Sequence, residues 1–255
     1  MRHVRLLALY IQRSFLEWMG FRSFLFTLVV NQAVAPVLGL AVWSAALPER
    51  SGTSTYFVAL LAVQLMTVSY EYHTVSMGIY QGSLNESLLR PHPMVIAPLG
   101  ENLATRAWHL LIGFPIVAIT MAIAGVAFDA GDVVLALPAL ALAAMLRFLF
   151  TYALALSALW GQQSGGVTEL GTTLVFLLGG MAVPIPLLPE SVRPFGEALP
   201  FRAMLGFPAE VATGSLSNQE MIQGYGWQML WLAVFVAVAM IVWTAGVRRY
   251  TALGG

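Results

Sequence analysis

Residues 226–247 read GWQMLWLAVFVAVAMIVWTAGV, a run of 22 residues without a charged side chain. An α-helix rises about 1.5 Å per residue, so this run is long enough to cross the roughly 30 Å hydrocarbon core of a bilayer. A helix satisfies its own backbone hydrogen bonds, which lipid cannot satisfy. The stretch therefore predicts a transmembrane helix and places the chain among integral membrane proteins.

Five further apolar runs toward the N-terminus are long enough to do the same. The six predicted spans are Phe24–Leu47, Thr55–Tyr80, Leu103–Phe128, Val133–Trp160, Thr168–Leu188 and Gly226–Val247. The composition agrees, because 59% of the residues are hydrophobic and only 9% are charged, against about 25% charged residues in soluble domains. We expect an all-α integral membrane protein with six transmembrane helices.

An amphipathic segment precedes the first span. Its apolar face carries Val4, Leu7, Ala8, Ile11, Phe15 and Trp18, and its polar face carries Arg2, Arg5, Gln12, Arg13 and Glu17. This pattern predicts a helix in the membrane interface over residues 1–22, ahead of a membrane domain over residues 23–255. A solvated helix packed on a partner is one alternative. A cleaved signal peptide is another, but the apolar run after Arg22 exceeds the roughly 7–15 residues of a signal core.

The arginines mark the orientation. They lie before the first span (Arg2, Arg5, Arg13, Arg22), around the connection between the second and third spans (Arg90, Arg106) and after the last span (Arg248, Arg249). The alternate connections carry acids instead: Glu49, Asp129, Asp132, Glu190, Glu197, Glu210 and Glu220, with Arg50, Arg193 and Arg202 as exceptions. Cytoplasmic loops retain arginine, so we expect a multi-pass protein of a bacterial inner membrane with both termini in the cytoplasm.

The predicted cytoplasmic segment 81–101 contains GSLNESLLRPHP at residues 82–93. Ser83 followed by Glu86 is a capping-box pattern that predicts a helix start, and Pro91 ends the helix after about two turns. Leu84, Leu88 and Leu89 are expected on one face. A helix this short is marginal alone in water, so that face is expected to dock into a partner or to pack under its own bundle.

Several short motifs together resemble the type 2 ABC-transporter permease family over essentially the whole chain. They are Gly82, Leu84, Leu88–Pro91, Leu159–Trp160, Pro184–Leu187, Leu199–Phe201, Arg248–Tyr250 and Gly254–Gly255. The sequence departs from the family pattern at Leu159, where a phenylalanine is expected, and at Ser83, where an acidic residue is expected. The resemblance implies an exporter subunit that pairs with the same or a sister chain over two separate ABC ATPase subunits.

The resemblance also assigns roles. The N-terminal segment would be a connecting helix, and the residues that couple to the ATPase would be Ser83, Leu84, Glu86, Leu88, Leu89, Arg90 and Pro91. The chain contains no lysine, and a Walker-type ATPase needs one against the nucleotide phosphates. No cofactor is therefore expected in this chain, and Mg-ATP is expected in the partner ATPase. The implied cargo is an amphipathic or hydrophobic molecule such as a lipid, drug or natural product.

The polar insertion 189–225 before the last span would, by the same resemblance, contain short re-entrant helices. Prolines at 184, 186 and 189 interrupt the fifth predicted span near its outer end, and non-helical backbone at membrane depth needs protein or a water cavity around it. Pro184, Pro186, Pro200 and Phe201 are candidates for an outer gate. A packed outer loop without a moving part is the alternative.

Ionisable residues inside the predicted spans are the remaining candidates, because burying a charge in lipid is costly. Glu71 and His73 lie in the second span and Arg147 in the fourth. We favour an interhelical ion pair of Glu71 with Arg147, or side chains that reach the headgroups, over a proton relay through Glu71 and His73. A proton-coupled secondary transporter that uses Glu71 and Arg147 is the alternative function.

Little in the sequence points to catalysis or to nucleic acid. The chain has no cysteine, and its histidines (His3, His73, His92, His109) fall in four separate segments without metal-ligand spacing. The serines lack the Gly-x-Ser-x-Gly pattern of a nucleophile elbow. There is no long basic stripe, and the charged residues are too few to assemble the site of a lipid-modifying intramembrane enzyme. We expect no catalytic residue, no metal site and no nucleic-acid partner; membrane lipids surround the chain.

Overall fold

Helices dominate the computed structural model, which describes residues 2–47, 52–161 and 165–250. The α-helices are α1 (Arg2–Met19), α2 (Arg22–Ala46), α3 (Thr53–Thr67), α4 (Met77–Tyr80), α5 (Leu84–Leu88), α6 (Ile96–Ala124), α7 (Ala130–Ala155), α8 (Gly165–Leu178), α9 (Arg193–Ala198), α10 (Pro200–Met204), α11 (Gly206–Ala212) and α12 (Asn218–Val247). A π-helix, η1 (Tyr72–Ser76), and two 3-10 turns, η2 (Leu156–Leu159) and η3 (Ile185–Leu187), join them. Predictions that involve Glu49, Arg50, Gly254 and Gly255 lie outside the described residues.

Five helical segments of the described chain are long and apolar enough to cross a membrane, where six were predicted. They are Arg22–Ala46, Thr53–Tyr80, Ile96–Ala124, Ala130–Leu159 and Asn218–Val247. The predicted span Thr168–Leu188 is instead the 14-residue helix α8, which at about 1.5 Å per residue reaches only about 21 Å. The chain turns directly after it at Gly180, whose φ of +92° favours glycine, and the prolines beyond prevent the helix from continuing.

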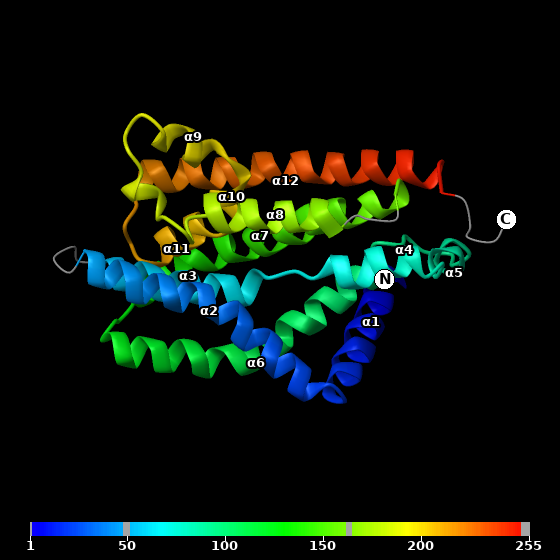
Figure 1. The fold of residues 1–255 in the computed structure, drawn as a ribbon, viewed down its shortest axis with the longest axis horizontal. Coiled ribbons are helices and arrows are strands. Elements are labelled where there is room, and N and C mark those ends of the chain that lie inside the picture. Colours follow the sequence, from blue (N-terminus) through cyan, green and yellow to red (C-terminus); the bar gives the residue numbers. More distant parts are fainter. Residues whose placement is uncertain (1, 48–51, 162–164, 251–255) are drawn as a thin grey trace.

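The long helices run roughly along the longest axis of the molecule (Figure 1). The start of α1, the short helices α4 and α5 and the end of α12 lie at one end of this axis, and α9 lies toward the other. α1 crosses the axis instead of following it, which is the direction expected of a helix in the membrane interface. The side of the membrane on which the two termini lie stays a prediction.

Polar side chains form hydrogen bonds at the starts of several helices. Asp129 caps α7 by accepting hydrogen bonds from the backbone amides of Gly131 and Asp132. Ser217 and Glu220 form a complete capping box at the start of α12, a pattern that the sequence analysis assigned to Ser83 and Glu86. The predicted box at Ser83 is wrong, because the Ser83 hydroxyl donates to the carbonyl of Gly78 at 2.9 Å. That bond ties α5 back to α4.

The segment Thr53–Tyr80 is the centre of the bundle. In its most apolar window 67% of the residues are buried inside the protein, against 11% for the corresponding windows of α6 and α12. The largest buried cluster joins α3 to α7, α8, α10 and α11, and a smaller one joins it to α2 and α6. Gln64, Thr67, Glu71 and Ser76 on this span are accordingly buried within the protein, whereas His73 is exposed.

The amphipathic helix α1 packs against the first half of α6. Phe15 stacks on Trp108 with ring centroids 4.7 Å apart, and the Trp108 indole donates to the Phe15 carbonyl at 3.1 Å. Tyr10 lies directly over Gly100, where an added Cβ would come within 2.5 Å of the Tyr10 Cβ. The predicted apolar face of α1 is thus partly covered by the protein's own third span, while Val4 at its start stays 72% exposed.

Candidate functional site

The central span is broken in its middle. The helix α3 ends at Thr67, residues 68–70 have no regular structure, and the chain resumes at Glu71 through the π-helix η1. Non-helical backbone at membrane depth must find partners within the protein, and π-helical turns are frequent at functional sites. The break is therefore a candidate functional site. Polar side chains from four helices meet there.

We call this group the mid-span polar network. Its members are Gln32 from α2, Gln64, Thr67, Ser69 and Glu71 from the broken span, Asn102 and Arg106 from α6, and Arg147 and Thr151 from α7. Apart from Arg147 and Glu71, none of them was a predicted site residue. The sequence feature that could have indicated them is the presence of neutral polar side chains, such as Gln64 and Asn102, in or beside apolar runs.

Glu71 is held by neutral donors. Its side chain is buried, with 2% exposure, and the Asn102 amide donates to one carboxylate oxygen at 2.7 Å. The Thr151 hydroxyl donates to the other oxygen. Asn102 also donates to the Ser69 hydroxyl at 3.0 Å, so one side chain ties the carboxylate to the broken backbone. The Asn102 Oδ1 atom is buried and has no hydrogen-bond partner among the described residues.

The two arginines of the network also bind neutral groups. Arg147 donates to the Gln64 side chain at 2.6 Å and to the Thr67 hydroxyl at 3.1 Å, and Gln64 in turn donates to Gln32 at 2.6 Å. Arg106 donates to the Ser69 hydroxyl at 3.0 Å and to the Ala144 carbonyl at 2.5 Å. These bonds connect four helices around the break, and Arg106 also donates to the Thr67 carbonyl at the end of α3 at 3.4 Å.

The predicted ion pair between Glu71 and Arg147 is wrong. In the part of the chain that the structure describes, neither arginine of the network lies within 4.0 Å of the Glu71 carboxylate. His73 is exposed and packs edge-on against Tyr72, with ring centroids 5.3 Å apart, whereas Glu71 faces Asn102 and Thr151. The two residues therefore point in different directions, as their spacing on a helix predicts.

A second candidate region lies at the end of the bundle that carries α5. The predicted helix is present over Leu84–Leu88, but its leucines do not share one environment: Leu84 is 1% exposed, Leu88 43% and Leu89 86%. Leu84 packs into a buried cluster of its own bundle, which corrects the expectation of one leucine face. Ser83 and Pro91, on either side of the helix, are both exposed.

Arg90 connects α5 to the amphipathic helix α1. Its guanidinium donates to Glu86 at 2.8 Å and to the Tyr10 hydroxyl at 3.1 Å. The same hydroxyl lies 3.2 Å from the His92 ring. Arg90 thus joins α5 to α1, and the hydrogen bond from Ser83 to Gly78 joins it to the broken span.

The third region contains the predicted gate residues near α9 at the opposite end. Pro184 is buried, and Pro186, in η3, is exposed. Pro200 and Phe201 are both buried in α10, where Phe201 packs edge-on against Phe150 of α7 with centroids 6.0 Å apart. Every residue from 200 to 211 is buried, so α10 and α11 form a packed plug between the long helices.

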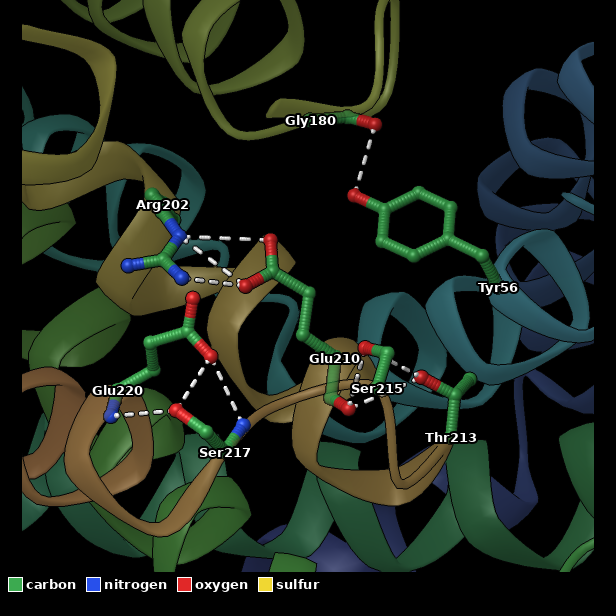
Figure 2. Close-up of polar contacts among 8 residues, drawn as sticks. All are labelled: Tyr56, Gly180, Arg202, Glu210, Thr213, Ser215, Ser217 and Glu220. Carbon is green, nitrogen blue, oxygen red and sulfur yellow. Dashed lines mark hydrogen bonds and ion pairs between the residues drawn. The ribbon is translucent and has the colours of Figure 1, made fainter. Parts of the chain in front are cut away.

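An ion pair that sequence reasoning did not predict holds this plug together. Arg202 on α10 donates to the carboxylate of Glu210 on α11, and Tyr56 on α3 donates to the Gly180 carbonyl at 3.1 Å (Figure 2). Burial raises the pKa of the Glu210 carboxyl, although the Arg202 charge acts in the opposite direction. From the sequence, Arg202 and Glu210 indicate only the orientation of the chain.

A search of the described residues for three or more His, Asp or Glu side chains that could hold a metal ion finds no such group. The geometry therefore consists of hydrogen-bonded polar side chains, a short helix with exposed leucines and a buried plug.

The comparison with curated proteins finds no match. A family model described as "ABC-2 family transporter protein" matches residues 18–254, which include all five membrane-crossing helices, the short helix α5 and the plug. The resemblance that the sequence motifs indicated is thereby confirmed. The chain belongs to the ABC-2 family of transporter proteins and is the membrane permease component of an ABC transporter.

Proposed function

We propose that this chain is the permease of an exporter driven by separate ABC ATPase subunits, and that it moves an amphipathic or hydrophobic molecule out of a bacterial cell. Mg-ATP is bound and hydrolysed in those partner subunits. The chain works as a pair, with a second copy or with a sister permease. Both termini and α5 face the cytoplasm, and the segment of α9 to α11 lies on the outer side, re-entering the membrane as short helices.

The observation that carries the proposal is the exposed end of α5. Leu88, the last residue of α5, is 43% exposed, and Leu89, which follows it, is 86% exposed. The helix α5 lies at one end of the long axis of the molecule (Figure 1). Exposed apolar side chains outside the lipid-facing belt indicate an interaction site. The short helix is tied to the rest of the chain through Arg90 and Ser83, so a partner that grips it can move α1 and the broken span as well.

The mid-span polar network supports a conformational role for that span. Its helix is already interrupted, and hydrogen bonds from Asn102, Arg106 and Arg147 hold the two halves in place. Rigid-body motion of one half against the other requires two alternative arrangements of such contacts. Closure of the ATPases would displace α5 and α4. The break at residues 68–70 would then let η1 and α4, the second half of the span, tilt while α3 stays packed in the core.

The test is copurification in detergent of the tagged chain with the ABC ATPase encoded beside it. Leu88→Asp combined with Leu89→Asp should abolish retention of the ATPase. The matched control is Val192→Asp combined with Phe195→Asp, since these two apolar residues are also exposed, at 47% and 68%, near α9 at the other end. The control should retain the ATPase. If wild-type protein retains none, the ATPase-driven function fails, and proton-coupled transport becomes the function to test.

A further inference from the structure

A groove of about 880 Å³ opens between α1, α4, α5 and the start of α6. Its walls include Tyr10, Trp18 and Phe21 on one side and His73 and Met77 on the other, with Glu101 at the start of α6. Pockets for small molecules typically measure about 300–1,000 Å³, so the groove has the size of a site for one drug-sized ligand. It lies between the amphipathic helix and the broken span.

The charges that line this groove do not balance. Arg13 lies 3.9 Å from Glu17, and Arg90 lies 2.8 Å from Glu86, so these four form two ion pairs. Glu101 has no cation within 4.0 Å among the described residues, and its carboxylate has no hydrogen-bond donor there either. Among the described residues that line the groove, Glu101 is therefore the acid without an ion pair or a hydrogen-bond donor.

A second acid, Glu71, lies near Glu101. Glu101, Glu71 and Asn102 line a small cavity of about 10 Å³, which holds no more than about one water molecule. Glu71 is bound by neutral donors only, and the buried Oδ1 atom of Asn102 has no partner. Two acceptors on α6 therefore have no donor among the described residues: the Glu101 carboxylate, which lines the groove, and the Asn102 Oδ1 atom, which lies beside it in the sequence.

The α1 side of the groove is aromatic. Trp18 and Phe24 stack with centroids 6.2 Å apart and an interplanar angle of 8°, and Phe21 beside them is 61% exposed. Aromatic faces attract organic cations, and the attraction is strongest for tryptophan. A carboxylate without an ion pair and a set of aromatic rings that line one groove are the chemistry that recognises a positive charge on an apolar body.

We propose that this groove binds a lipophilic organic cation, with its charge at Glu101 and its apolar body against Trp18, Phe21 and Phe24. The proposal rests on the permease function above and names its substrate class. The groove reaches the broken span through His73 and Met77, so a bound cation would contact the half of that span that α5 is placed to move.

The test is equilibrium binding of radiolabelled tetraphenylphosphonium to the purified full chain in dodecyl maltoside, which contains no ammonium group. Wild-type protein should bind this cation, and Glu101→Gln should weaken binding about tenfold. Glu169→Gln, which removes an exposed acid from α8 outside the groove, should bind as wild type does. Trp18→Leu should weaken binding about threefold, the size of one exposed cation–π contact. Tetraphenylborate, of the same shape and opposite charge, should not bind.

Folding is checked separately. Glu101→Gln removes an unpaired, partly buried charge, so its unfolding midpoint should not fall below that of wild type, and Glu101→Asp should retain part of the binding. Equal binding by wild type and Glu101→Gln would overturn the proposal, as would equal binding of tetraphenylborate. Competition by added phosphatidylethanolamine would also overturn it, by assigning the groove to a lipid ammonium. If the wild-type chain retains its ATPase but binds no cation, only the groove assignment fails.

Discussion

Arg202 and Glu210 form a buried ion pair between α10 and α11, with the guanidinium Nη2 2.5 Å from the carboxylate Oε2 and the side chains 10% and 1% exposed. Removing one partner of such a pair leaves an uncompensated buried charge. Arg202→Met and Glu210→Leu should therefore each lower the free energy of unfolding by about 3–5 kcal/mol. Unfolding by sodium dodecyl sulfate in mixed micelles, followed by far-UV circular dichroism, measures the loss.

The double substitution Arg202→Met with Glu210→Leu supplies the control for this pair. Because both charges are then gone, the double variant should be more stable than either single variant, and the two effects should not add. Additive losses would mean that the pair does not hold the plug together.

A second prediction concerns the helix start that the sequence analysis placed at Ser83. Ser217, not Ser83, caps a helix by a capping box, and loss of such a cap costs about 0.5–2 kcal/mol. Ser217→Ala should lower the unfolding free energy by that amount and speed amide hydrogen exchange in the first turn of α12. The matched substitution Ser83→Ala should change stability by less than about 0.5 kcal/mol; an equal loss at both sites would contradict the assignment.

Two serines with the same spacing to a glutamate make different hydrogen bonds in the structure, and only Ser217 forms a capping box. Ser83 and Glu86 have the same spacing as Ser217 and Glu220, but a pattern does not say which acceptor the serine hydroxyl prefers. At Ser83 a tight turn at Gly82, with φ +79°, brings the Gly78 carbonyl within reach. The positions of most membrane-crossing helices, in contrast, were predictable from the sequence, because lipid requires such helices to be long and apolar. The exception, α8, has the right composition but is ended by Gly180 and the prolines that follow.

The mid-span polar network was beyond the reach of the sequence for a different reason. Arg106 was read as a flanking charge, because the third span was predicted to begin at Leu103, whereas α6 begins at Ile96. Asn102 and Thr151 come from spans that are neighbours only in the fold. Which buried polar side chains meet depends on the rotation of each helix about its axis, and apolar runs with weak periodicity do not fix that rotation.

A third prediction concerns the docking of α1. A Cβ at Gly100 would lie 2.5 Å from the Tyr10 Cβ and 3.3 Å from the Ile11 backbone nitrogen, so a larger residue must push α1 away. Gly100→Leu should cost about 1–3 kcal/mol. The natural chain lacks cysteine, so the maleimide labelling rate of a cysteine placed at Ile11 reports the displacement and should rise. Gly226→Leu, where an added Cβ meets nothing within 4 Å, is the control and should leave the rate unchanged.

The fourth prediction concerns the hydrogen bond that the Thr151 hydroxyl donates to the Glu71 carboxylate. Hydrogen bonds to a charged group contribute about 1.5–3 kcal/mol, and a buried carboxylate that loses one keeps the cost of its burial. Thr151→Val should therefore lower the unfolding free energy by about that amount. Thr120→Val is the matched control, because the Thr120 hydroxyl donates at 2.8 Å to the carbonyl four residues earlier and has no carboxylate partner. It should cost less than about 0.5 kcal/mol.

The interaction with Glu71 is isolated by a double-mutant cycle. Glu71→Gln replaces the buried carboxylate by a neutral amide that needs fewer donors, so Thr151→Val should cost less in that background than in the wild type. The difference in unfolding free energy gives the coupling between the two side chains. If Thr151→Val costs the same in both backgrounds, the hydroxyl supports only its own helix, through its 2.7 Å bond to the Arg147 carbonyl. The network would then have no bond from α7 to the second half of the broken span through this residue, and Asn102 alone would hold Glu71 in place.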